Sequence, residues 1–281
     1  MIKKILILLL LLCCPVYGQW QDGLKPLLGT QIDWSNPLAK GLVGLWLMNE
    51  GTGNIVQDLS GNGNTGTFVG TLDWVPGKLG PALSWNAADE YIDFPTITSI
   101  PGEVTLIAWV WIPSSPWQMQ PLFSFSKDAG TYILLYNNTD ATGPLKHWFS
   151  TRVEYAAKVT VESDTNVVTN KWIQVAMTRN SAGLWKMFLD GVQQVNTQTM
   201  AGALTGLVTH KFGDDAIVGN ITFTGKADNL SIYNRALTAG EIADLYTNPF
   251  GIIQPTFSVW WYSGIGGEPP ATFGQVIMIS N

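Results

Sequence analysis

Oxygen-bearing side chains are concentrated in one short stretch of this chain, Asp58-Leu-Ser-Gly-Asn62-Gly-Asn64. Calcium binds about six to eight oxygens from carboxylates, amide side chains and backbone carbonyls. The glycines in the stretch accept backbone angles that let carbonyl groups converge. We therefore expect Asp58, Asn62 and Asn64 to be calcium ligands. The same residues are also typical of an Asn/Gly turn in which the aspartate accepts backbone N–H groups, and both interpretations stay open.

Histidine chemistry has little support in the sequence. His147 and His210 are the only two histidines, and neither has a second histidine at metal-binding spacing. A Gly-x-Ser-x-Gly element, which would mark a serine nucleophile, does not occur either. We expect both histidines to be surface residues or hydrogen-bonded core residues.

Tryptophan is frequent, with 13 in the chain. An indole face can stack on the apolar side of a sugar ring. Trp117 and Trp148 lie in or beside irregular segments, and we expect these two to form a ligand-binding platform. Five others fall in strand patterns and are expected in the core: Trp46, Trp85, Trp109, Trp172 and Trp185.

Composition favours a folded β protein. Of 281 residues, 46% are hydrophobic and only 13% are charged, which is enough apolar material for a core. The 29 glycines and 15 prolines are scattered between apolar runs, as turns between strands would be. The net charge is −6 and no basic cluster follows residue 18, so nucleic acid is not expected as a partner.

Residues 1–18 have the pattern of an export signal. Two lysines precede an apolar run over residues 5–14, and Val-Tyr-Gly offers a cleavage site before Gln19. Acylation at Cys13 or Cys14 is the alternative, although Leu12 stands where a lipoprotein signal has a small residue. Both cysteines lie in this leader, so the mature chain would have no disulfide and no cysteine nucleophile. No later segment is long and apolar enough for a membrane span, and we expect a secreted protein.

About a dozen short strand patterns follow, separated by regular turn signals. Residues 104–112 are apolar on both faces, which predicts a central strand covered on both sides. Asp190-Gly191 predicts a two-residue hairpin between residues 184–189 and 192–196. Residues 121–125 and 131–136 predict a second hairpin.

One helix is predicted near the end of the chain, over residues 239–246. Thr238 and Glu241 are spaced as a capping box, and Leu237 and Ile242 as a hydrophobic staple. The segment before it alternates as a half-buried strand does. We expect an extended N-terminal arm at 19–40, one domain at 41–247 and an aromatic, Pro/Gly-rich appendage at 248–281.

Six separated motifs occur in a recognisable order: GLVGLWLMNEGTGN, DLSGNGNTGT, GPALSWNAADEYIDFP, VTLIAWVWI, WIQVAMTRNSAGLWKMFLDGVQ and ADNLSIYNRALTAGEIADLY. Together they resemble the laminin G-like, concanavalin A-like jelly-roll family. The resemblance implies an all-β, two-sheet antiparallel jelly-roll sandwich that binds sugars or proteins, often with a bound calcium. It also implies that Asp228, in the ADN motif, lies near the Asp58 loop and is a further calcium ligand.

Enzymes that resemble this family place Glu-x-Asp-x-x-Glu on one strand, so that two carboxylates face the same side. Glu162 and Asp164 begin such a pattern, but positions 167 and 168 are both valine. The acid/base partner is therefore missing, and we expect no catalytic activity.

The function we expect is that of a secreted, non-catalytic binding module that recognises carbohydrate, or a protein partner, through loops at the sandwich edge. A structural or adhesive protein of a cell or phage-particle surface, assembling through residues 19–40 and 248–281, is the first alternative. A glycosidase on the same fold is the second, disfavoured alternative. The sequence leaves the ligand's identity and the oligomeric state open.

Overall fold

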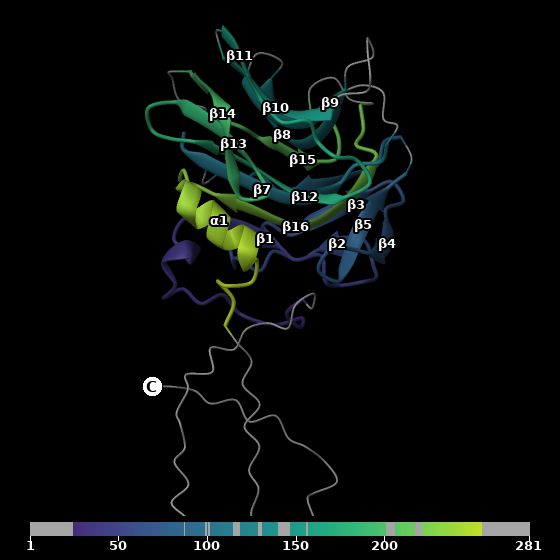
Figure 1. The fold of residues 1–281 in the computed structure, drawn as a ribbon. Coiled ribbons are helices and arrows are strands. Elements are labelled where there is room, and N and C mark those ends of the chain that lie inside the picture. The colour runs from purple at the N-terminus through teal and green to yellow at the C-terminus, as the bar shows by residue number, and fades with distance from the viewer. Residues whose placement is uncertain are drawn as a thin grey trace, which may run out of the picture.

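The computed structural model describes residues 25–254 except 87, 99, 101, 115–118, 129–130, 140–146, 156, 201–205 and 217–220. Of residues 138–139, 147–148, 151–155 and 157–159 it describes the backbone alone. Within this part of the chain, the strands form two antiparallel sheets stacked as a sandwich (Figure 1). The expected two-sheet antiparallel β fold is confirmed.

The first sheet has eight strands among the described residues, and β16 lies near its middle. β1 (Leu42–Trp46) pairs with the second half of β16. The other strands follow the order β14 (Val192–Thr199), β13 (Leu184–Leu189), β12 (Trp172–Arg179), β7 (Val104–Trp111), β16 (Gly225–Tyr233), β5 (Pro81–Trp85) and β4 (Asp73–Pro76).

The second sheet also has eight strands in the described part, and its strands β8 to β11 lie above β7, β12 and β16 of the first sheet in Figure 1. Its order is β11 (Ala157–Glu162), β10 (His147–Tyr155), β9 (Thr131–Thr139), β8 (Gln120–Asp128), β15 (Thr209–Phe212), β6 (Tyr91–Phe94), β3 (Gly66–Val69) and β2 (Ile55–Val56). β8 and β9 form the predicted hairpin.

β7 is apolar throughout because both of its faces are covered. Alternate side chains point in opposite directions along a strand. Leu106, Ala108 and Val110 lie in the core between the sheets. Ile107 and Trp109 lie in a second apolar cluster on the outer side of the first sheet. The prediction of a central strand covered on both sides is confirmed.

The core between the sheets is rich in aromatic rings. Trp46, Trp85 and Trp185 are fully buried there, and Trp85 packs against Phe212 and Phe223. Trp109 is buried in the outer cluster, where Trp172 is partly buried. The core prediction is thus confirmed for four tryptophans, and the fifth packs at the margin.

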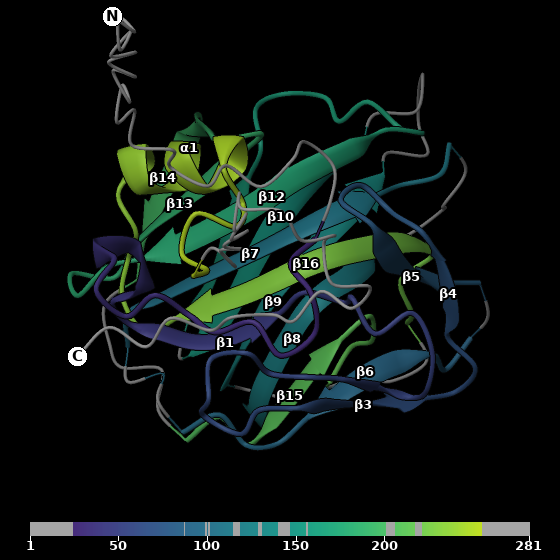
Figure 2. The same cartoon turned by 90° about the horizontal axis from the view of Figure 1, so that it is seen from below.

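The outer face of the first sheet is covered by α1 (Ala239–Thr247) and the flanking segments (Figures 1 and 2). The predicted capping box is present, since the Thr238 side chain accepts the Glu241 N–H and the Glu241 carboxylate accepts the Thr238 N–H. Leu237 and Ile242 are both buried in the outer cluster, as the staple predicts.

The described parts of the two flanks lie together. Residues 25–40 contain one short 3₁₀ helix, η1 (Pro37–Ala39). Ile32 forms an antiparallel bridge with Ile253, and the Asp33 N–H donates to the Ile252 carbonyl over 2.8 Å. Leader residues 1–18 and appendage residues 255–281 lie outside the described residues.

Candidate functional site

Asp58 organises its own loop. Its Oδ1 accepts the N–H groups of Leu45 (3.1 Å) and Ser60 (2.9 Å). Its Oδ2 accepts the Ser60 hydroxyl (2.8 Å) and the Asn64 N–H (2.9 Å). A carboxylate offers about four lone-pair directions, and three backbone N–H groups occupy three of them. The single Ser60 hydroxyl hydrogen is shared between Asp58 and the Val43 carbonyl, which is also 2.8 Å away. Asp58 therefore holds the loop against β1, as the turn interpretation expects.

Asn62 and Asn64 bind the same strand. Both side-chain amides donate to the Val43 carbonyl, over 3.0 and 2.9 Å. Asn64 is buried, and its own carbonyl accepts the Trp46 indole N–H at 2.8 Å. In the described part of the chain, no three His, Cys, Asp or Glu residues gather as a metal site would need.

Asp228 lies on β16 at a β-bulge. Asp228 pairs with Trp109 and Ser231 with Ile107, so β16 holds one residue more than β7 over this stretch. Asn229 between them has a left-handed backbone (φ 49°). A bulge redirects side chains. Here the buried Asp228 carboxylate reaches the loop after β4, where its Oδ2 accepts the N–H groups of Lys78 and Leu79, both at 3.1 Å.

The other oxygen of Asp228 is paired with the N-terminal arm. Lys25 Nζ lies 2.5 Å from Asp228 Oδ1, and the two side chains are 3% and 0% exposed. Burial raises the pKa of the Asp228 carboxyl and lowers that of the Lys25 ammonium, and the attraction between the two opposes both shifts. Sequence reasoning found Asp228 but missed Lys25.

The described residues therefore do not fit one calcium ion shared by Asp58 and Asp228. The Asp58 carboxylate is engaged by its loop, and the Asp228 carboxylate by Lys25 and two backbone N–H groups. Calcium on Asp228 would have to displace a buried ammonium. Calcium binding stays a prediction that needs a measurement.

The acid pair of the glycosidase interpretation lies at the surface. Asp164 Oδ1 accepts the Val195 N–H at 3.1 Å, and the Glu162 carbonyl accepts the Asn196 side chain at 3.1 Å. Val167, where a third acid would belong, is buried in the core between the sheets. These contacts join β11 to β14.

His210 is a core residue. It is fully buried on β15, its ring packs on Phe125 with centroids 4.7 Å apart, and its Nδ1 accepts the Ile97 N–H at 3.5 Å. Burial lowers its pKa to about 4, so the imidazole is neutral at pH 7. The expectation of a core histidine is met at this position. The side chain of His147 lies outside the described residues.

Neither member of the predicted tryptophan platform is described by the structure. Trp117 falls in an undescribed stretch, and Trp148 lies on β10 without a described side chain. A different tryptophan lines an open groove, which we call the Trp74 groove. Its volume is about 530 Å³, and it is lined by Gly51, Trp74, Val75, Pro76, Gly77, Lys78, Gly80 and Pro81.

β4 is the edge strand of the first sheet, next to β5 (Figure 2). The Trp74 groove is lined mainly by residues of β4 and of the loop from β4 to β5. Trp74 is half-buried; its ring packs on Phe68 with centroids 5.8 Å apart, and its N–H donates to the Gly53 carbonyl at 3.0 Å. The Phe68 ring and the Gly53 carbonyl thus fix the position of the indole. A sequence signal for this site is a tryptophan two residues before Pro76-Gly77, where a strand must end at a turn.

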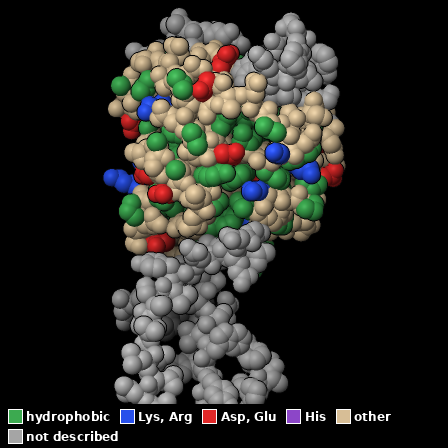
Figure 3. All heavy atoms as spheres, viewed as in Figure 1, with side chains coloured by type: hydrophobic (Ala, Val, Ile, Leu, Met, Phe, Trp, Pro, Cys, Tyr) green, Lys and Arg blue, Asp and Glu red, His purple; other side chains and the backbone are tan. Residues whose placement is uncertain are grey.

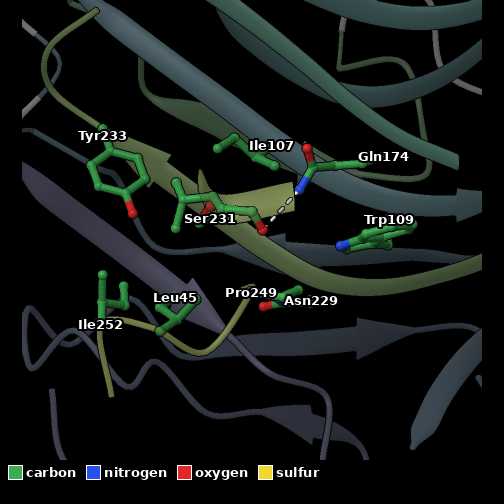
Figure 4. A pocket seen from close by; sticks show the side chains of 10 residues that line it. Leu45, Ile107, Trp109, Gln174, Asn229, Ser231, Tyr233, Pro249 and Ile252 are labelled. Atoms are coloured by element: carbon green, nitrogen blue, oxygen red, sulfur yellow. Dashed lines mark hydrogen bonds between the residues drawn. The ribbon is translucent and has the colours of Figure 1, made fainter. Parts of the chain in front are cut away.

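A second, much smaller cavity of about 10 Å³ has Leu245 of α1 in its lining, and its other lining residues are labelled in Figure 4. Its lining residues come from β7, β12 and β16, with Leu45, Pro249 and Ile252 across from them. Gln174 Nε2 donates to the Leu245 carbonyl at 3.4 Å. Four buried polar atoms of the lining residues have no hydrogen-bond partner within the described part of the chain: Trp109 Nε1, Gln174 Oε1, Asn229 Oδ1 and Tyr233 Oη.

The surface shown in Figure 3 has acidic, basic and hydrophobic side chains interspersed, with lysines and arginines scattered across it. Within the described residues, no helix has the length and apolar character needed to cross a membrane.

Solved structures share this fold. Domain 4 of a GH43 extracellular arabinanase from Geobacillus stearothermophilus, solved with arabinotriose, is 21% identical, with a TM-score of 0.59 over 73% of this chain and 98% of that one. The binding domain of Paraclostridial Mosquitocidal Protein 1 is 16% identical (TM-score 0.62; 76% and 53% covered). Trypanosoma rangeli sialidase is 19% identical (TM-score 0.57; 75% and 33% covered).

These likenesses include both glycosidases and binding domains and, at such identities, they show the fold alone. The chain spans about half of the mosquitocidal binding-domain chain and a third of the sialidase. No curated protein matches it. The laminin G-type family described as the concanavalin A-like lectin/glucanases superfamily matches residues 86–243, more than half of the chain. This chain is therefore a member of the concanavalin A-like lectin/glucanases superfamily.

Proposed function

We propose that the chain is a secreted, non-catalytic carbohydrate-binding domain whose ligand lies in the Trp74 groove. The observation that carries the proposal is the open groove itself, with a half-buried tryptophan in its wall at the edge of the sandwich. The fold agrees with it, since a domain of similar fold was solved with arabinotriose.

The groove suits a sugar ring chemically. An indole face packs on the C–H groups of a pyranose or furanose ring, while rim groups bind its hydroxyls. The bond from Trp74 Nε1 to the Gly53 carbonyl fixes the indole before a ligand arrives, which lowers the entropy cost of binding. Gly51, Gly77 and Gly80 add no side chain to the lining, which leaves space along the groove.

The lining also supports a binding function over a catalytic one. Glycosidases generally place two carboxylates on either side of the scissile bond. The eight residues that line the Trp74 groove include no aspartate and no glutamate. A sugar bound there would meet an aromatic ring, backbone groups and Lys78, which cannot serve as that pair.

A glycan array probed with the purified chain, once in calcium and once in chelator, tests this function. The array should include arabinan oligosaccharides and sialylated glycans alongside plant and bacterial polysaccharide fragments. We expect binding to at least one class, with no shortening of the bound oligosaccharide on prolonged incubation. An array with no bound class would contradict carbohydrate recognition, and cleavage products would contradict the non-catalytic assignment.

A structural or adhesive function is the second candidate, favoured by the N-terminal arm. Leu27, Leu28 and Trp34 are 68%, 59% and 58% exposed within eight residues of chain. Exposed apolar side chains of this kind often mark a contact with a partner. Sedimentation analysis of the wild type and of a Leu27→Ser/Leu28→Ser variant separates the candidates. Assembly that the variant loses would favour adhesion, and a monomer in both cases would favour the carbohydrate-binding domain.

A further inference from the structure

The Lys25 ammonium is enclosed by oxygen atoms from three segments that are far apart in the sequence. It lies 2.5 Å from Asp228 Oδ1, donates to the Met48 carbonyl at 2.9 Å, and also donates to the Pro81 carbonyl. An ammonium has three N–H groups, and each one here meets an oxygen. We call these three oxygens the Lys25 cage.

Several backbone features converge to build the Lys25 cage. Met48 is fully buried and has a left-handed backbone (φ 54°), uncommon for a residue with a side chain. The bulge at Asn229 directs Asp228 into the cage. A Cβ on Gly77 would lie 2.7 Å from Asp228 Oδ2, so only glycine lets the loop come this close. Strained positions that cluster in this way are typical of functional sites.

The donor set is that of a hard cation. One carboxylate oxygen and two backbone carbonyls are ligands that calcium takes in proteins. A second carboxylate also acts on Lys25: burial lowers the pKa of the ammonium, and attraction first from Asp228 and then from Glu50 opposes that shift. Glu50 Oε1 accepts the Gln57 N–H at 2.7 Å, while Glu50 Oε2 is buried and has no hydrogen-bond partner among the described residues. The two acids and two carbonyls would supply four oxygens, and water the remainder.

The arm beside Lys25 is anchored independently of the ion pair. The Asn49 side chain donates to the Pro26 carbonyl at 2.8 Å, which ties the arm to the segment after β1. An ordered segment therefore holds Lys25 in position at the cage.

From this geometry we propose that Lys25 is a built-in cation at a site that would otherwise bind calcium. The ammonium compensates the buried Asp228 carboxylate and joins the N-terminal arm to β16, to the start of β5 and to Met48. The natural chain accordingly needs no calcium for stability. Removal of the ammonium exposes a calcium site made of Asp228, Met48, Pro81 and Glu50.

Thermal unfolding of the full chain in excess calcium and in chelator tests the proposal. The variants are Lys25→Ala, which empties the cage, and Lys40→Ala, which removes an exposed lysine as a control. We expect the same midpoint in both conditions for the wild type and for Lys40→Ala. Lys25→Ala should lose about 10 °C in chelator, because a buried carboxylate is left unpaired, and should regain several degrees in calcium.

A double variant, Lys25→Met with Asp228→Asn, keeps the test decisive if Lys25→Ala does not fold in chelator. Both charges are then absent, so we expect the double variant to fold and to have the same midpoint of thermal unfolding in calcium and in chelator. The single variant Lys25→Ala should in that case refold only when calcium is present. Three results would overturn the proposal: a calcium-dependent midpoint in the wild type, an unchanged midpoint for Lys25→Ala in chelator, or a Lys25→Ala variant that calcium does not stabilise. Calorimetric titration with calcium tests the same point without heating: Lys25→Ala should bind calcium and the wild type should not.

Discussion

Lys25 and Asp228 form a buried ion pair directly beneath the Trp74 groove. Pro81, whose carbonyl accepts an N–H of Lys25, lines the groove. Lys78, whose backbone N–H donates to Asp228, and Gly77 before it line the groove too. The ion pair and one wall of the groove therefore share the same loop. A change in one should alter the other.

Gly77→Ala should destabilise the fold and weaken ligand binding together. The added Cβ would lie 2.4 Å from the Ala82 Cβ and 2.7 Å from Asp228 Oδ2, so the loop must shift away from the carboxylate. We expect a loss of about 1–3 kcal/mol in the free energy of unfolding, measured by urea denaturation.

Gly240→Ala is the matched control. Gly240 lies in α1, and an added Cβ there meets its nearest neighbour only at 4.0 Å. Alanine in a helix should stabilise by up to about 1 kcal/mol, since it lowers the entropy of the unfolded chain. If both glycine variants had the stability of the wild type, the close approach at Gly77 would be wrong.

Stability should fall in mild acid because of His210. Burial lowers its pKa to about 4 from the usual 6.5. A group whose folded pKa is depressed binds its proton more readily in the unfolded chain, so stability falls as the pH drops below about 6.5. The contribution lost between about pH 7 and about pH 5 is about 2 kcal/mol.

Denaturation of the wild type and of His210→Phe at both pH values measures this term. Phenylalanine cannot titrate, so the variant should lose less stability on acidification, and the difference between the two proteins isolates the histidine. An equal loss in both would mean that His210 titrates normally in the folded protein.

The Thr238–Glu241 capping box should be worth about 1 kcal/mol to the fold. Glu241 also binds Arg235 through both carboxylate oxygens, at 2.7 and 2.9 Å. The hydrogen bonds from Arg235 lower the pKa of Glu241, so this contribution is present at neutral pH and is lost as the pH falls through the depressed folded value. Thr238→Ala should reduce the free energy of unfolding, whereas Thr247→Ala at the other end of α1 should change it little.

Local patterns were sufficient for most elements of this fold. The hairpin at Asp190-Gly191 follows from two residues that accept left-handed angles, with φ of 48° and 79°. The helix start follows from the spacing of Thr238 and Glu241. β7 could be placed at the centre of a covered sheet because both of its faces are apolar. In each of these cases, the residues that indicate the element lie within a few positions of it in the sequence.

The site was predicted less well because its contacts are long-range. Asp228 could be singled out, but nothing near it in sequence indicates Lys25, which comes from the opposite end of the chain. The Asp58 loop has the composition of a metal site and the hydrogen bonds of a turn. Trp74 resembles a strand tryptophan, and its open side depends on how the loop from β4 to β5 folds back.

The small cavity that Leu245 of α1 helps to line should hold one water molecule. Its volume of about 10 Å³ is near the minimum for a water, and four lining residues present polar atoms without a hydrogen-bond partner among the described residues. A high-resolution crystal structure should show density bound to Tyr233 Oη. Tyr233→Phe should then cost about 1 kcal/mol, whereas a dry cavity would make the variant equal to or more stable than the wild type.

Calorimetric titration of wild type, Trp74→Ala and Trp34→Ala with the glycan found on the array tests the central claim most directly. Trp34 is an exposed tryptophan outside the groove, so it controls for non-specific stacking. With folding verified by circular dichroism, Trp74→Ala should weaken binding by at least about tenfold, because an aromatic anchor in a pocket carries much of the affinity. Trp34→Ala should bind as the wild type does. Wild-type affinity in Trp74→Ala would contradict the assignment of the groove as the carbohydrate site.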